Sequence, residues 1–151
     1  MYVLADWKKQ DPVVRWNLPD RIFFGHGACH LLSGVFLRRR INPTFDAYWV
    51  RPENHPGNHI YVSDGVVAFD YHGYSLLSRL QQHHRKCWQR QYPGWTADVV
   101  PVDFDLLDES ALNARNMRGP DQYHGDAIAR TEAYLDRIDH QAAEQKARTL
   151  A

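Results

Sequence analysis

The stretch "HIYVSDGVVAFD" (residues 59–70) decides the fold. Two runs rich in β-branched and aromatic residues flank the dipeptide Asp64-Gly65, which suits the two-residue type I′ turn of a β-hairpin. Within each run, large apolar side chains alternate with polar or small ones, as in strands that bury one face. The sequence therefore predicts an antiparallel hairpin over these residues.

The alternation also predicts which side chains share a face of the hairpin. If Asp64 and Gly65 are the loop residues, His59 lies directly opposite Asp70, with their β-carbons about 4.5–5.5 Å apart. A carboxylate at that separation orients the imidazole ring and raises its pKa. The opposite face is wholly apolar and is expected in the core: Ile60, Val62, Val67 and Phe69.

Further elements follow from periodicity and from turn residues on both sides of the hairpin. Strands are expected at 45–51 and 97–104, and helices at 28–40, 75–90, 105–117 and 125–140, with Ser75 as a helix N-cap. Residues 1–22 read as irregular and the last ten as frayed. Sequential strands joined by hairpins predict an α+β fold: an antiparallel sheet of about four strands packed with helices.

Composition excludes several classes of protein. The 151 residues carry 18 basic and 18 acidic side chains, so the formal net charge is zero and bulk attraction to a nucleic acid or an anionic membrane is not expected. No apolar run approaches the roughly 20 residues that span a bilayer. Neither a nucleic acid nor a membrane is therefore expected as a partner, and composition does not identify the small-molecule or peptide substrate. Nothing indicates the oligomeric state.

Length and cysteine content suggest a single domain over residues 1–151, with a core from about 20 to 140. The start, "MYVLADWKKQDPVVRW", lacks the pattern of a secretory signal. Two cysteines, Cys29 and Cys87, imply no disulfide framework, although one bridge between them is compatible with the sequence. A cytoplasmic protein with reduced thiols is expected.

The stretch "FFGHGACHLL" (residues 23–32) places Cys29 where a glycine-rich approach enters a helix. The unpaired amides and the positive dipole end of a first helical turn favour thiolate over thiol. The same amides suit a developing oxyanion. Cys29 is therefore a candidate nucleophile, whereas Cys87 lies on the apolar stripe of its helix and is expected in the core.

A cysteine that opens a helix, followed by a histidine that begins a strand and an aspartate on the next strand, resembles the papain-like and transglutaminase-like thiol enzymes. The resemblance covers roughly residues 25–75 and rests on order and context. It implies a papain- or transglutaminase-like core and a cysteine-dependent hydrolase or acyltransferase acting on an amide, isopeptide or thioester carbonyl. Carried over, Cys29 is the nucleophile, His59 the base and Asp70 the orienting group, with no cofactor or metal.

Three departures from that pattern concern the oxyanion hole and the hairpin. Position 23 is Phe where papain-type enzymes place a glutamine upstream of the cysteine, and His30 replaces the aromatic residue that commonly follows the nucleophile. Asp70 follows His59 by only 11 positions, less than is usual in transglutaminases. Other oxyanion donors or substrate contacts are then needed, and the candidates are His26, His30, Asn17 and Tyr61.

Two other functional classes fit the same residues. A non-catalytic binding or interaction domain would keep the His59–Asp70 pair as a structural ion pair at a strand end. A small zinc-binding protein would draw its ligands from histidines and one cysteine. No CxxC or HExxH motif accompanies these possible ligands, which are His26, Cys29, His30, His55, His59 and His72.

Overall fold

A five-stranded antiparallel sheet forms the centre of the computed structural model, which describes residues 5–151. The strand order is β4-β3-β2-β1-β5, and every neighbouring pair is antiparallel. The predicted α+β class is therefore confirmed, but the expected number of strands was one too low. The strands are β1 (Asp46–Pro52), β2 (His59–Ser63), β3 (Val67–Asp70), β4 (Gly73–Leu76) and β5 (Ala97–Pro101).

The additional strand is β4, which forms a second hairpin with β3. Asp70 pairs with Gly73 across a two-residue turn, and Gly73 adopts a φ of +93° that favours glycine. The Asp70 carboxylate accepts a hydrogen bond from the backbone amide of His72 at 2.8 Å, which stabilises the turn. Ser75, expected to cap a helix, lies within β4 instead, and the helix begins at Leu77.

The first hairpin differs from its predicted register by two residues. Val62 pairs with Phe69 and Ser63 with Ala68, so the two loop residues are Gly65 and Val66. Gly65 has a φ of +94°, whereas Asp64 sits before the loop and accepts bonds from the amides of Val66 and Val67. Since side chains alternate with a period of two, this shift leaves each side chain on its predicted face but makes His59 and Asp70 diagonal neighbours.

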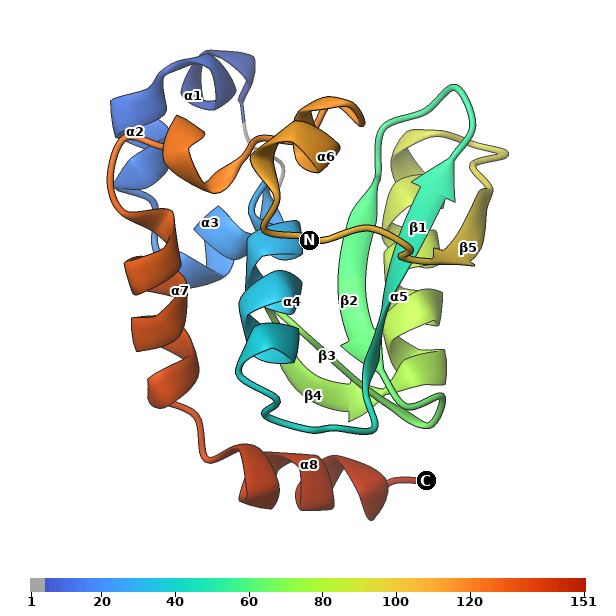
Figure 1. Ribbon diagram of the computed structural model, residues 1–151. Coiled ribbons are helices and arrows are strands. Elements are labelled where there is room, and N and C mark those ends of the chain that lie inside the picture. Colours follow the sequence, from blue (N-terminus) through green and yellow to red (C-terminus); the bar gives the residue numbers. More distant parts are fainter. Residues whose placement is uncertain (1–4) are drawn as a thin grey trace.

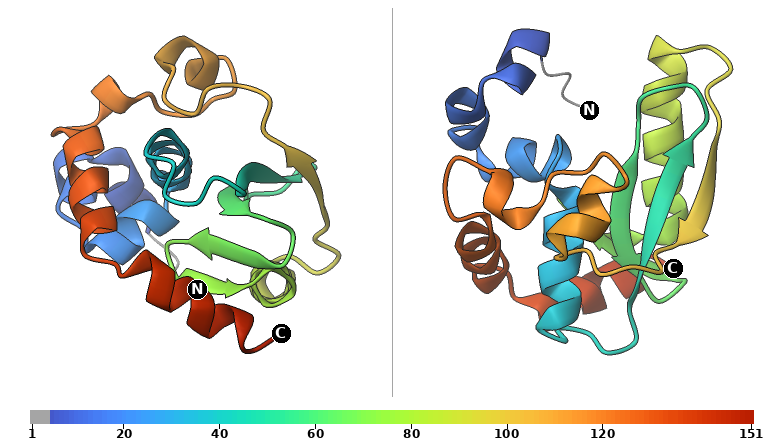
Figure 2. Two further views of the ribbon diagram at one scale, coloured as in Figure 1. Left: turned by 60° about the horizontal axis from the view of Figure 1, so that its bottom comes forward. Right: turned by 45° about the horizontal axis from the view of Figure 1, so that its top comes forward.

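Helices cover both faces of the sheet (Figures 1 and 2). Helix α4 packs against β2 on one face with α7 beside it, whereas α5 packs on the other face against β3 and β4. The helices are α1 (Asp6–Gln10), α2 (Pro12–Trp16), α3 (Asp20–Gly25), α4 (Cys29–Arg38), α5 (Leu77–Gln91), α6 (Glu109–Asn113), α7 (Ala127–Asp136) and α8 (His140–Arg148), with a 3-10 turn, η1 (Pro120–Gln122).

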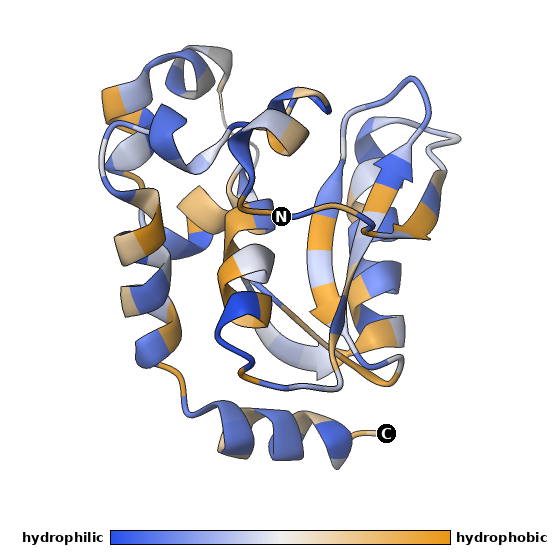
Figure 3. Cartoon of the chain, viewed as in Figure 1, coloured by the Kyte–Doolittle hydropathy of each residue, from blue (hydrophilic) through white to orange (hydrophobic). Residues whose placement is uncertain are grey.

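The two faces of the sheet bury separate apolar clusters. The larger one lies between the sheet and α4, and it includes the four hairpin residues predicted for the core. The smaller one lies under α5 and contains Tyr61, Ala68, Leu80 and Trp95. Hydrophobic residues accordingly concentrate on α4 and the central strands, while α8 is mostly hydrophilic (Figure 3).

Both ends of the chain are more regular than expected. Residues 1–4 of the N-terminal stretch lie outside the described part, and the remainder up to Gly25 forms the three short helices α1, α2 and α3. The C-terminal residues, expected to fray, form α8. Helix α8 packs against β3 and β4 and buries Ala147, because its Asp139 N-cap and its few small apolar side chains suffice for a short amphipathic helix. Over residues 5–151, no helix has the length and apolarity needed to cross a membrane.

Candidate active site

Cys29, His59 and Asp70 each lie at the end of a secondary-structure element. Cys29 is the first residue of α4, His59 the first of β2 and Asp70 the last of β3. Because α4 packs on β2 and β2 pairs with β3, the three ends meet at one end of these central strands. The fold thus brings together the three residues that the sequence singled out.

His59 and Asp70 form a buried hydrogen-bonded ion pair. Nε2 of His59 lies 2.9 Å from Oδ2 of Asp70, and the two side chains are only 4% and 3% exposed. Nε2 is thereby engaged, and Nδ1 is the nitrogen left to exchange a proton with another group. Asp70 is itself held by the His72 amide and by the His72 ring, whose Nδ1 is 3.4 Å from Oδ1.

Aromatic side chains fix the plane of the His59 ring. His84, on α5, stacks on it with ring centroids 5.2 Å apart and planes inclined by 18°. Tyr71 meets it edge-on at 5.5 Å. Nε2 of His84 donates to the carbonyl of Gly57 at 2.8 Å, while burial and the charge of His59 lower the pKa of His84 to about 4. A neutral ring therefore lies against His59 at neutral pH.

The pKa values of Cys29 and His59 shift in opposite directions. Burial disfavours the thiolate, but hydrogen bonding to His30 and His59 and the charge of His59 lower the pKa of Cys29 from 9.0 to about 5. Burial likewise opposes a charged ring, but Asp70 and Cys29 raise the pKa of His59 from 6.5 to about 10. Hydrogen bonds from His59 and His72 hold the pKa of the buried Asp70 well below 3.8. These shifts favour a thiolate, an imidazolium and a carboxylate at neutral pH.

The backbone around Cys29 supports a thiolate. The sulfur accepts a hydrogen bond from the amide of Ile60 at 3.5 Å, and it lies in the first turn of a ten-residue helix. Gly27, two residues earlier, has a φ of +108°, and a β-carbon there would lie 1.7 Å from Nη2 of Arg15. Arg15 donates to the carbonyl of His26 and Tyr123 to that of Gly27, both at 2.6 Å. These two hydrogen bonds fix the backbone that leads into Cys29.

Cys29 and His59 line the same cavity, which has a volume of about 250 Å³. Of the four predicted oxyanion donors or substrate contacts, His30 also lines it, and its Nε2 donates to the carbonyl of Arg118 at 2.7 Å. The other three lie outside the cavity wall. His26 is the C-cap that follows α3, the side-chain amide of Asn17 donates to the carbonyl of Val13, and Tyr61 is buried under α5.

The cavity wall also contains residues that the sequence analysis did not identify. Asn58 precedes His59, and its Oδ1 accepts a bond from the Trp49 indole at 2.9 Å, which leaves its NH₂ group as a donor on the wall of the cavity that Cys29 also lines. The polar position before β2 was the available signal for Asn58. The loop after α6 contributes Asn116, Met117 and Arg118. Nothing in the local sequence pattern links that loop to Cys29.

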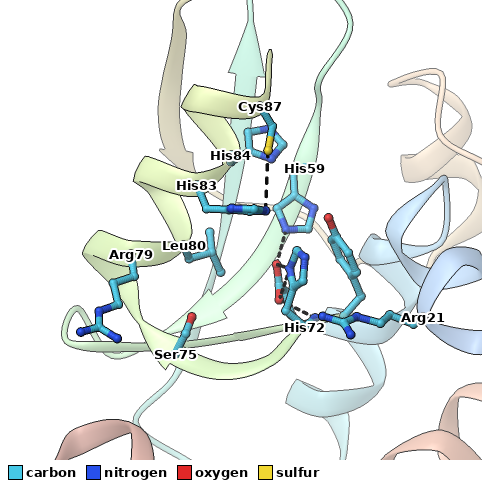
Figure 4. A pocket seen from close by; sticks show the side chains of 11 residues that line it. Arg21, His59, His72, Ser75, Arg79, Leu80, His83, His84 and Cys87 are labelled. Atoms are coloured by element: carbon cyan, nitrogen blue, oxygen red, sulfur yellow. Dashed lines mark hydrogen bonds and ion pairs between the residues drawn. The ribbon is translucent and has the colours of Figure 1, made fainter. Parts of the chain in front are cut away.

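A second cavity, of about 400 Å³, lies on the other side of the ion pair (Figure 4). His59 and Asp70 form part of its wall, and α5 supplies His83, His84 and Cys87. Cys87 is buried as predicted, and its sulfur lies 3.7 Å from Nε2 of His83. Arg21 and Arg79 lie at opposite ends of this cavity and do not converge.

The cysteines and histidines form neither a disulfide nor a metal cluster within the described part of the chain. Cys29 and Cys87 are both free. No group of three or more histidine, cysteine, aspartate or glutamate side chains over residues 5–151 is arranged to hold a metal ion.

Comparison with models of protein families, with curated proteins and with solved structures finds no match to this chain.

Proposed function

We propose that this protein is a thiol-dependent acyl-transfer enzyme, a hydrolase or an acyltransferase, with Cys29 as nucleophile, His59 as proton carrier and Asp70 as the group that orients His59. The observation that carries the proposal is the 2.9 Å bond between His59 Nε2 and Asp70. This bond leaves Nδ1 as the nitrogen available for proton transfer, and His59 lines the same cavity as Cys29. Asp70 thus fixes both the orientation and the charge of the ring.

The proposed reaction has two steps, acylation of Cys29 and deacylation. The Cys29 thiolate forms a bond to the substrate carbonyl carbon, and the bond to the leaving group breaks as His59 donates its Nδ1 proton to that group. Water or another acceptor then gives a proton to His59 and attacks the acyl carbon. The carbon–sulfur bond breaks, and the thiolate is restored. Hydrolysis and transfer differ only in the acceptor.

Two groups of donors are candidates for binding the oxyanion. The first-turn amides of α4, including that of Cys29 itself, have no acceptor within the helix. The Asn58 NH₂ group is a second source, since Trp49 occupies its Oδ1. These groups are prearranged by the fold, which is the condition for stabilising charge as it develops in the transition state.

Alkylation of the thiol tests the proposal directly. We expect Cys29 in the native Cys87→Ser variant to react with iodoacetamide at pH 6 much faster than glutathione, because it is already a thiolate. His59→Gln should remove that advantage and Asn58→Ala should keep it, with circular dichroism to verify folding. Labelling of Cys29 no faster than glutathione would refute the nucleophile and favour a non-catalytic binding domain.

Acyl transfer itself is tested by mass spectrometry. Brief incubation with 4-nitrophenyl acetate should give an acetyl group on Cys29, which Asp70→Asn slows and Cys29→Ser abolishes. The acetyl group should then leave in water or on addition of an amine. Rapid alkylation without any acyl adduct would contradict an acyl-transfer function, and stoichiometric zinc in the purified protein would instead support the metal-binding class.

A further inference from the structure

The wall of the Cys29 cavity contains basic side chains and no acidic one. Arg15 and Arg118 line it, and none of the 12 residues that form the wall, all within the described part of the chain, is aspartate or glutamate. Asp70, the partner of His59, lines the second cavity and not this one. A ligand in this cavity therefore meets the side chains of Arg15 and Arg118 as well as those of Cys29 and His59.

Arg118 lies in the loop between α6 and η1 and, unlike five arginines in or directly after α4, α7 and α8, has no ion-pair partner within the described residues. Arg38, Arg39, Arg130, Arg137 and Arg148 all form ion pairs with carboxylates. Arg118 has no carboxylate partner among residues 5–151, and its guanidinium lies 5.3 Å from the centre of the Tyr123 ring. Its backbone is held by the bond from His30, so the side chain starts from a fixed point on the cavity wall.

The charge of Arg118 also reaches its neighbours. After burial, the proximity of Arg118 is the main reason that the pKa of the Arg15 guanidinium is lowered, and both arginines act to lower the pKa of Tyr123. A cation on a cavity wall that has no carboxylate partner, as Arg118 has none within residues 5–151, is stabilised by an anion bound near it.

We propose that this cavity selects acyl substrates that carry a negatively charged group close to the reacting carbonyl, and that Arg118 is the specificity-determining residue that binds this group. The inference rests on the proposed function of Cys29. A volume of about 250 Å³ lies below the ~300–1,000 Å³ typical of pockets for drug-sized ligands, so the bound part is small, such as a short acyl chain that ends in a carboxylate.

The ratio of two alkylation rates measures this charge selectivity without any turnover. Iodoacetate and iodoacetamide deliver nearly the same group to sulfur, but only iodoacetate is anionic. In the Cys87→Ser background, we expect the iodoacetate-to-iodoacetamide rate ratio at Cys29 to exceed that of glutathione by about tenfold, and to fall as salt is added.

Arginine variants test whether Arg118 causes the raised rate ratio. Arg118→Gln should return the ratio close to the glutathione value, while Arg118→Lys should keep most of it. Arg115→Gln is the matched control: Arg115 lies three residues earlier, stacks on Phe104 and lies outside the cavity wall. It should leave the ratio unchanged. The same order should hold for acylation by 4-nitrophenyl hemisuccinate relative to the neutral butyrate ester.

Failure of this inference is distinguishable from failure of the proposed function. Fast labelling by iodoacetamide at pH 6 with a ratio equal to that of glutathione, or a raised ratio that Arg118→Gln does not change, would overturn the role of Arg118 and leave the thiol chemistry intact. Slow labelling of Cys29 by both reagents would overturn the proposed function and this inference with it.

Discussion

Nε2 of His59 lies 2.9 Å from Oδ2 of Asp70 although the two residues are diagonal rather than directly opposed in the β2–β3 hairpin. The long imidazole side chain spans the diagonal, and the His72 amide holds the carboxylate in place. Because both partners are buried, loss of either one leaves a polar group without compensation. The stability and the chemistry of this site should therefore change together.

Replacement of Asp70 tests that coupling. Asp70→Asn keeps the shape of the side chain but removes its charge, and we expect the free energy of unfolding to fall by about 3–5 kcal/mol. The pKa of Cys29 should rise, since His59 is then less strongly protonated. Urea denaturation and the pH profile of alkylation measure the two effects.

His72→Ala is the matched control for Asp70→Asn. It removes the ring contact at 3.4 Å but keeps the backbone amide bond to Asp70, so the loss should stay within about 1 kcal/mol. A loss as large as that of Asp70→Asn would mean that the His72 ring, and not the His59 pair, holds the carboxylate.

The opposite pKa shifts of Cys29 and His59 predict how stability depends on pH. The thiol, with a pKa lowered from 9.0 to about 5, contributes stability that is lost as pH falls through that window. The imidazole, with a pKa raised from 6.5 to about 10, contributes stability that is lost as pH rises through its window. The two slopes cancel between pH 6.5 and 9.0, so stability should be flat there and fall by about 1–2 kcal/mol on each side.

The Cys29→Ser variant separates the two contributions. Without the thiolate, no gain in stability with pH offsets the loss that comes from deprotonation of the imidazolium. The free energy of unfolding should therefore begin to fall as pH rises above 6.5. Denaturation midpoints from pH 5 to 10 provide the measurement. If the variant and the parent protein show the same plateau, the thiol does not ionise in this range.

Gly27 controls the approach of the chain to Cys29. Gly27→Ala places a methyl group against the guanidinium of Arg15 and requires an unfavourable backbone conformation, so we expect slower alkylation of Cys29 and a loss of about 1–3 kcal/mol. Gly94→Ala is the matched control, because Gly94 has a φ of +85° with open space around it. It should reproduce the backbone cost and leave the alkylation rate unchanged.

Removal of α8 tests whether this helix belongs to the folded unit. Deletion of residues 140–151 uncovers β4 and removes the bond between Tyr74 and His140 at 2.8 Å, so we expect a loss of about 2–4 kcal/mol. Deletion of residues 149–151 alone retains Ala147 and should leave the thermal midpoint almost unchanged. Equal midpoints for both deletions would mean that α8 does not stabilise the sheet.

The hairpin shows how an incorrect turn can still predict the correct face. Ile60 and Val62 were placed in the core by alternation, and an error of two residues in register preserves that alternation. The turn itself was misplaced because Asp64 uses its carboxylate to cap the loop instead of entering it. Strand β4 was missed because four residues after a tight turn carry too little periodicity.

The residues of the candidate site also differ in whether the sequence could identify them. Cys29, His59 and Asp70 could be chosen from sequence because each lies at the end of an element with its own local signal. Arg118 could not, since it reaches the cavity through a loop whose position depends on the packing of α6 and η1. Tertiary packing, rather than periodicity, brings such a residue to the thiol.

The ion pair between Asp64 and Arg148 has a consequence for the order of synthesis. Arg148 lies 84 residues after Asp64, so the hairpin turn leaves the ribosome long before the side chain that clamps it. Until then the turn depends on bonds within its own few residues, from Ser63 to the Val67 carbonyl and from the Val66 amide to Asp64. The strand register of the nascent hairpin therefore has to be set by these local bonds, and α8 stabilises that register later through Arg148.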